Sequence, residues 1–218
     1  MARADRNRRR RRVARWSSVS PCSHSVSWSV GCSGASCEPL NRGALHATIK
    51  EAMALVIDVI RLLYGYSTWA NTRIMTQVAN LTPAQYIAPG NASHSSVRDT
   101  LVHLLWGQAL WLSRWQERGD IPDEDPEAYT DLDVLRTRWD DIDAATQAFI
   151  SRLDEAMLHA VVHYRIRGTA YALPLWQLMV HQVNHATQHR SEVATILTAY
   201  GHSPGSLDLV IYLQRPSV

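Results

Sequence analysis

Three histidines spaced four residues apart are the part of this sequence best suited to metal chemistry. His181, His185 and His189 lie in the segment 174–200, where apolar residues recur every three or four positions, as on a helix with one buried face. Residues four apart share one side of a helix, so two such imidazoles can direct nitrogens at one cation. A metal site and ordinary helix histidines both remain open interpretations. Ala186 follows His185, so the zinc-protease motif H-E-x-x-H is absent.

Charge is distributed unevenly along the 218 residues, although the formal net charge is only +2. Residues 1–52 hold 10 of the 22 basic residues and 3 of the 20 acidic ones, whereas residues 53–218 hold 12 basic and 17 acidic residues. The acidic remainder argues against a nucleic-acid surface on the second part. We therefore predict an Arg/Ser-rich tail over 1–52 and a folded domain over 53–218.

The tail is predicted to be disordered, because an arginine run and a Ser/Cys/Gly segment bury too little apolar surface. Three interpretations of it are open. The first is a nucleic-acid-binding arm that uses the arginines, and the second is a small zinc site. The third is an artefact of a start codon placed too far upstream, which is favoured by Met53 directly before the first periodic helix. The zinc ligands of the second interpretation are Cys22, His24, Cys32 and Cys37.

All three cysteines lie in this tail, so the domain has no disulfide framework. This fits a reducing compartment, and we expect a cytoplasmic protein. No apolar run approaches the roughly 18 residues that a membrane helix needs, so no membrane partner is expected. A secretory signal is not favoured, because the segment 17–36 is serine-rich where an apolar stretch is required.

The domain contains four long stretches with helical periodicity, joined by short irregular segments. They predict helices over about 52–79, 96–117, 131–158 and 174–200. Ser95 or Ser96 is expected to cap the second helix, and Gly201 is expected to end the fourth. Four such helices predict an all-α protein of the four-helix-bundle type, whose interior can hold a metal site between facing helices.

Two shorter elements complete this prediction. Residues 161–173 alternate in polarity around Gly168, which predicts a short two-stranded ribbon before the fourth helix. A last short helix is expected at about 206–213, after the turn that follows the fourth helix.

The second helix carries one further histidine, His103, on its inner side. A single helix histidine is more often a hydrogen-bonded core residue than a ligand, so the residues alone do not favour His103 as a ligand. His163, in the ribbon, is likewise taken as an ordinary histidine.

Taken together, residues 53–213 resemble the DinB family, also described with the YfiT-like putative metal-dependent hydrolases. The run in the fourth helix is the most specific feature, because the family usually shows N-H-x-x-x-H-R there. Four sequence runs carry the resemblance: L-L-Y-G-Y-S-T-W-A-N-T-R, V-R-D-T-L-V-H-L-L-W-G, V-N-H-A-T-Q-H-R and G-H-S-P-G-S-L-D-L.

The resemblance implies a divalent metal, nickel or zinc, held by His103 of the second helix and by His185 and His189 of the fourth. It places His181 near the site without making it a ligand. The chain departs from the family's H-H-R-G-Q run at Gln188, Ser191 and Glu192. Glu192 lies one turn beyond His189, where it can orient that ring from behind, or it can be a surface residue.

Three imidazoles leave an open coordination position, which is typical of a catalytic metal. The resemblance implies a hydrolase, or a transferase that uses a low-molecular-weight thiol as cosubstrate. No catalytic residue beyond the ligands is assigned, and the substrate is a small molecule in this interpretation. The alternative is a non-catalytic, stress-linked metal-binding protein. Nucleic-acid binding through the arginine tail is a weaker alternative, and a homodimer through helix faces is a further hypothesis.

Overall fold

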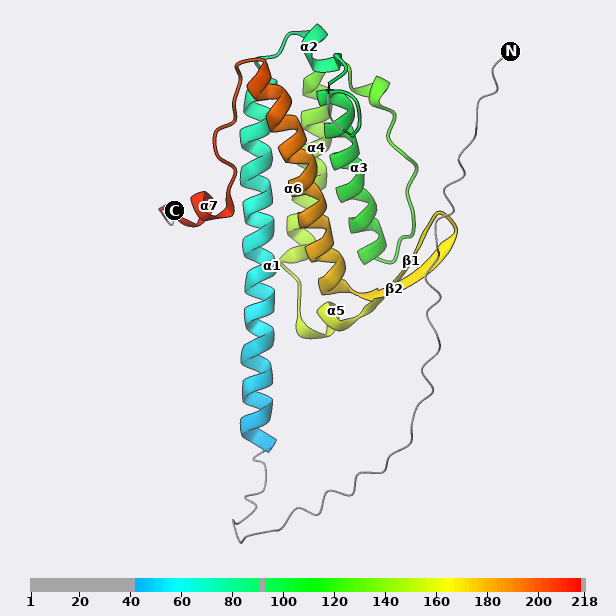
Figure 1. Cartoon of the computed structure of the whole chain (residues 1–218). Coiled ribbons are helices and arrows are strands. Elements are labelled where there is room, and N and C mark those ends of the chain that lie inside the picture. Colours follow the sequence, from blue (N-terminus) through cyan, green and yellow to red (C-terminus); the bar gives the residue numbers. More distant parts are fainter. Residues whose placement is uncertain (1–41, 91–92, 217–218) are drawn as a thin grey trace, which may run out of the picture. The chain divides into compact units, whose positions relative to one another are not determined.

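The computed structural model describes residues 42–90 and 93–216, which belong to one compact unit (Figure 1). The predictions for tail residues 1–41 lie outside the described residues. The helices are α1 (Arg42–Val78), α2 (Pro83–Ile87), α3 (Val97–Trp115), α4 (Leu132–Ile150), α5 (Glu155–His159), α6 (Leu175–Ala199) and α7 (Leu209–Leu213), with a 3-10 turn η1 (Pro126–Tyr129) and the strands β1 (Val161–Ile166) and β2 (Thr169–Pro174).

The four long helices α1, α3, α4 and α6 form a bundle with the short elements at its ends and sides (Figure 1). Helix α6 packs against both α1 and α3, and α4 completes the bundle by contacting the same two helices. The predicted all-α four-helix bundle, with a ribbon before the fourth helix and a short C-terminal helix, is therefore confirmed. None of the helices in the described part of the chain has the length and apolar character that crossing a bilayer requires.

Several helix ends follow the local chemistry of the sequence. Ser96 is the N-cap of α3, and its side chain accepts a hydrogen bond from the backbone N–H of Asp99. Thr82 and Gln85 form a capping box at the start of α2. After α6, Gly201 adopts a φ of 81°, which only glycine reaches at little cost, as predicted for the end of this helix.

Two predicted helices differ in extent from the observed ones. Helix α1 begins at Arg42, about ten residues before the predicted start, so residues 42–52 are helical and the disordered tail predicted over 1–52 is wrong there. Helix propensity explains this, because residues 44–52 contain neither proline nor glycine. The helix predicted over 131–158 is interrupted after Ile150, and Asp154 caps a separate α5. Aspartate satisfies free N–H groups at a helix start better than it serves a helix interior.

The ribbon is an antiparallel hairpin in which Ile166 pairs with Thr169. Arg167 and Gly168 form its tip, and both have positive φ, 48° and 82°. Two consecutive positive φ values are typical of the two-residue turns that match the twist of a hairpin. The hairpin extends from the end of the bundle, beside α3 and the start of α6 (Figure 1).

The apolar interior divides into two clusters along the bundle. One contains Trp111 of α3 and Met179 of α6, and the other contains Leu101 of α3 and Val193 of α6. The middle turns of α3 and α6 lie between these clusters. This level of the bundle is where the histidines meet.

Candidate metal centre

His103 of α3 and His185 of α6 face each other, with their Nε2 atoms 3.1 Å apart. Gly107, one turn after His103, faces the second ring, and an added Cβ there would lie 3.4 Å from Cε1 of His185. Two imidazoles bound to one ion at about 2.0–2.1 Å have nitrogens roughly 3 Å apart when the two bonds are near a right angle. The contact therefore has the spacing of two neighbouring ligands.

His189 is buried and lies one helical turn beyond His185. Its ring centroid is 4.5 Å from that of His185 and 4.8 Å from that of His103. Its Nδ1 lies 3.1 Å from Oε2 of Glu192. A carboxylate only accepts hydrogen bonds, so Nδ1 carries the hydrogen and Nε2 has a free lone pair. Glu192 is thus placed like the carboxylates that orient a metal-binding histidine through the ring nitrogen that does not bind the metal.

The environment favours the neutral form of His103 and His185. Burial, followed by the neighbouring histidines, lowers the pKa of His103 to about 3. Burial and then His189 and His181 lower the pKa of His185 to about 4. Metal binding needs an unprotonated nitrogen, so both rings are in the required state at neutral pH without competing protons.

A fourth histidine, His94, joins this cluster from the loop before α3. One ring nitrogen each of His94, His103 and His189 lie within 4.8 Å of one another. The His94 ring stacks on that of His103, with centroids 3.7 Å apart and planes 16° from parallel. This triad shares two members with the predicted one and contains His94 in place of His185.

His94 is not predicted as a site residue from the sequence, because it lies in a segment without helical periodicity. Ser95, the residue after it, has a φ of 70°, a conformation that few residues other than glycine adopt. This turn directs the preceding ring toward α3, and nothing in a single serine predicts it. The available signal was a histidine two residues before the helix cap Ser96.

His181 lies at the exposed edge of the cluster, its ring edge-on to Trp111. Together with His103 and His185 it lines a cavity of about 360 Å³ between α3 and the hairpin. It therefore lies where the resemblance places it, beside the site and toward solvent. The other residues lining this cavity include Trp106, Arg114, Asp123, Arg165 and Arg167.

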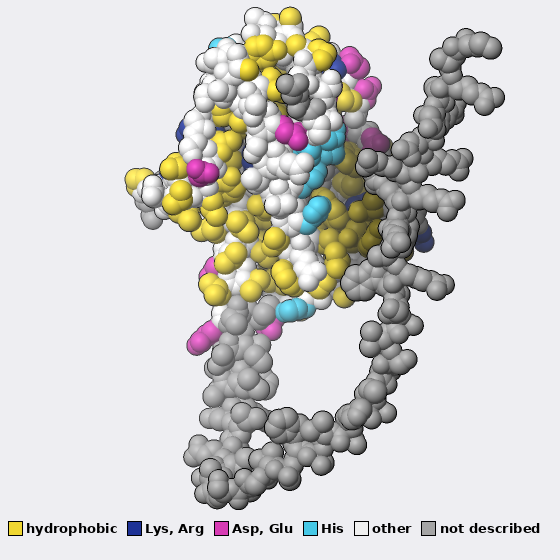
Figure 2. All heavy atoms as spheres, in the orientation of Figure 1, with side chains coloured by type: hydrophobic (Ala, Val, Ile, Leu, Met, Phe, Trp, Pro, Cys, Tyr) yellow, Lys and Arg dark blue, Asp and Glu magenta, His cyan; other side chains and the backbone are white. Residues whose placement is uncertain are grey.

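A second cavity, of about 340 Å³, lies on the other side of His103 and Trp106. It is lined by His94 and by the acidic residues Asp99, Asp123 and Glu124. On the face of the molecule shown in Figure 2, histidine side chains form a row over the region of α3 and α6. The cluster is thus reached from two cavities. The first is lined by both arginines and aspartates, and the second by carboxylates without an arginine.

A model of the DinB family matches residues 52–216. This chain belongs to the DinB family. No curated protein sequence matches it. Among solved structures, YfiT from Bacillus subtilis, described as a probable metal-dependent hydrolase with an unusual four-helix bundle topology, matches with 16% identity and a TM-score of 0.51 over 66% of this chain and 86% of YfiT.

A conserved protein from Enterococcus faecalis also matches, with 18% identity and a TM-score of 0.48 over 64% of this chain and 95% of the other. At these identities the likeness to YfiT shows a common DinB fold and not a common reaction. The donor set of the present chain fits a divalent metal, because several neutral imidazoles converge and one is held by a carboxylate.

Proposed function

We propose that this DinB-family chain is a metal-dependent enzyme that hydrolyses a small molecule or transfers a group to a low-molecular-weight thiol. His103, His185 and His189 are its metal ligands in this proposal, and the metal is nickel or zinc. The observation that carries it is the 3.1 Å contact between the Nε2 atoms of His103 and His185, two rings from different helices. Imidazole nitrogens suit both metals.

The chain's own residues prepare the site for a cation. Burial keeps His103 and His185 neutral, and Glu192 holds the hydrogen of His189 on Nδ1, so that Nε2 of this ring stays available. A divalent metal bound there supplies Lewis-acid chemistry, since it acidifies a bound water or thiol. The cavity of about 360 Å³ beside His185 provides space for a substrate, with Trp106 and Trp111 as apolar walls.

The composition of the domain supports an external thiol for the transferase form of the reaction. Residues 53–218 contain no cysteine, so the domain itself provides no sulfur nucleophile, and a thiol cosubstrate would supply one. Arg165 and Arg167 of the hairpin line the same cavity and suit a negatively charged group on such a molecule.

A second candidate function is the non-catalytic, stress-linked metal-binding protein. The fourth histidine favours it, because a fourth imidazole can fill the position that a catalytic metal leaves open. Exchangeable water or thiol at the metal distinguishes the two functions, since a closed shell of four protein ligands admits neither.

The test is the metal content of the full-length protein and of its His185→Ala variant, measured by elemental analysis. We expect about one nickel or zinc per chain in the parent and almost none in the variant. His163→Ala, at an exposed position of β1, is the control and should keep its metal. A His185→Ala protein with undiminished metal content would show that the ligand assignment is wrong.

If metal is bound, turnover of electrophiles with a panel of small thiols and without any thiol separates the transferase from the hydrolase.

A further inference from the structure

His94 is anchored in a way that leaves one of its ring nitrogens free. The hydroxyl of Ser93 donates to Oε2 of Glu192 at 2.8 Å and lies 3.1 Å from Nδ1 of His94. A hydroxyl has a single hydrogen, so the oxygen of Ser93 accepts from Nδ1–H of His94. Nε2 of His94 consequently keeps its lone pair.

The loop of His94 is tied to the same carboxylate that holds His189. Oε2 of Glu192 accepts from the backbone N–H and the hydroxyl of Ser93 and also contacts Nδ1 of His189. The backbone N–H of Gly90 donates to the carbonyl of Ser95 at 2.6 Å, which closes the loop around the positive φ of Ser95. Two histidines from separate elements are thus positioned by one acid.

The present orientation of His94 does not allow it to share an ion with His103. An imidazole binds a metal through a lone pair in the plane of its ring. The two rings are only 16° from parallel and 3.7 Å apart, so their planes do not meet near the nitrogens. His94 must therefore turn out of the stack before both rings can bind one ion.

We propose that His94 is an exchangeable fourth imidazole ligand of this metal centre. It takes the coordination position that His103, His185 and His189 leave free, and it returns to its stack on His103 when a small ligand takes that position. The inference rests on the proposed function for the other three ligands. It implies that substrates and cosubstrates of the site compete with a protein side chain, and that they bind through a single donor atom such as a thiolate sulfur or an oxygen.

Two substitutions separate ligation from stacking. His94→Phe keeps an aromatic ring of similar size and removes the nitrogens, whereas His94→Ala removes both. His163→Phe, at an exposed position of β1, controls for the loss of a histidine elsewhere. All variants are made in the full-length chain and loaded with Zn²⁺ or, for spectroscopy, with Co²⁺.

Three readouts apply to these proteins: the Zn²⁺ dissociation constant from chelator competition, the number of bound imidazoles from X-ray absorption, and azide binding to the Co²⁺ form from its visible spectrum. We expect His94→Phe and His94→Ala to weaken Zn²⁺ binding by at least tenfold and to lower the imidazole count by one. Azide should bind about tenfold more tightly to both variants, as expected if His94 occupies the position about nine-tenths of the time. His163→Phe should match the parent.

A His94→Phe protein that matches the parent in all three readouts overturns the inference. If His94→Ala alone is weakened, His94 acts only by stacking on His103, and the inference is again overturned. Failure of the proposed function is distinguishable from these results. If His185→Ala retains its metal while His94→Phe loses it, the proposed three-ligand set is wrong and His94 is a ligand; if the parent binds no metal, both are overturned.

Discussion

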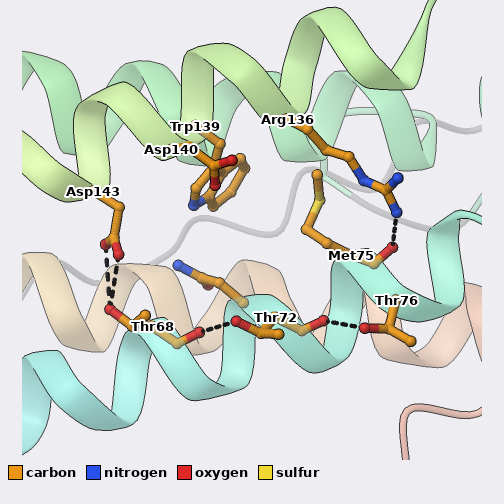
Figure 3. Close-up of a pocket in the computed structure, with 9 residues that line it drawn as sticks. Thr68, Thr72, Met75, Thr76, Arg136, Trp139, Asp140 and Asp143 are labelled. Carbon is orange, nitrogen blue, oxygen red and sulfur yellow. Dashed lines mark hydrogen bonds between the residues drawn. The ribbon is translucent and has the colours of Figure 1, made fainter.

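Two polar regions lie between helices of this bundle, and they are built differently. The first is a cavity of about 280 Å³ between α1 and α4, in which the side chains of one helix point toward the other (Figure 3). The carboxylate of Asp143 accepts from the hydroxyl of Thr68 at 3.1 Å and from the amide of Gln108 at 3.4 Å. Arg136 donates to the carbonyl of Met75. The polar groups here are largely partners of one another.

The histidine cluster between α3 and α6 contains imidazoles that face one another. His103 and His185 lie nitrogen to nitrogen and are held neutral by burial, although each prefers a charge at mildly acidic pH when it is exposed. A cation bound between these two nitrogens would take a lone pair from each. Polarity and a cavity therefore do not identify a binding site; the decisive feature is a set of imidazole nitrogens from different elements that converge at the spacing of metal ligands.

The two regions should differ most in their response to the removal of one carboxylate from each. Glu192→Ala removes the acceptor that contacts Nδ1 of His189 and should weaken metal binding by about 10–100-fold. Asp143→Ala leaves the hydroxyl of Thr68 without its acceptor and removes one of the two acceptors of the Gln108 amide. It should lower the free energy of unfolding by about 1–3 kcal/mol, with metal affinity unchanged. Chelator competition and urea unfolding of the metal-free proteins measure the two quantities.

Either substitution can also contradict the comparison. A loss of metal affinity in Asp143→Ala as large as that in Glu192→Ala would mean that the α1–α4 cavity communicates with the metal centre. Loss of stability without loss of affinity in Glu192→Ala would make this residue a loop anchor through Ser93, and not an orienting partner of His189.

The sequence predicts the bundle because helix periodicity and capping are local properties. Capping by Ser96, Thr82 and Gly201 involves only the nearby helix end, so it can be predicted from the local sequence. His185 and His189 are readable for the same reason, since a spacing of four fixes a shared face. The break of the third predicted helix before Asp154 was missed because the periodicity continues across it and only the cap marks the interruption.

The rest of the site depends on contacts between elements that are distant in sequence. His103 was a poor candidate from spacing alone, and only the family resemblance placed it opposite His185. His94 has no local signal, because its position depends on the positive φ of Ser95 and on a bond to Glu192, which is 99 residues from Ser93. Such contacts arise from the packing of α6 against the start of α3, which no single segment specifies.

The two regions should also respond to pH with opposite sign in the metal-free protein. Above pH 6.5 His103 is neutral in both the folded and the unfolded state. Between pH 6.5 and its folded pKa of about 3, only the unfolded state takes up the proton, so the free energy of unfolding decreases as the pH is lowered. Burial raises the pKa of Asp143 above its usual range, so protonation at acidic pH favours the folded state there.

Urea unfolding at pH 7, 5 and 4 measures both effects. His103→Phe should lose less stability than the parent between pH 7 and pH 5, and Asp143→Asn should lose more than the parent between pH 5 and pH 4. Equal losses in the parent and His103→Phe would show that the acid sensitivity does not arise from His103.

The smallest effect is expected at Gly107, where the helix faces the His185 ring. An added Cβ would lie 3.4 Å from Cε1 and 3.7 Å from Nδ1 of His185, which is ordinary van der Waals contact. Gly107→Ala should therefore raise the free energy of unfolding by about 0.5–1 kcal/mol, because alanine loses less backbone entropy in a helix interior. Metal affinity should change by less than about threefold, since the shift required of the ring is worth well under 1 kcal/mol.

Gly107→Leu provides the contrast, because a large side chain at this position has to displace the His185 ring, and affinity should fall while the helix is retained. If Gly107→Ala alone weakens metal binding tenfold or more, the His185 ring lies closer to α3 when the metal is bound than it does here. The cluster would then have to contract around the ion, and the 3.1 Å contact between His103 and His185 would describe only the metal-free arrangement.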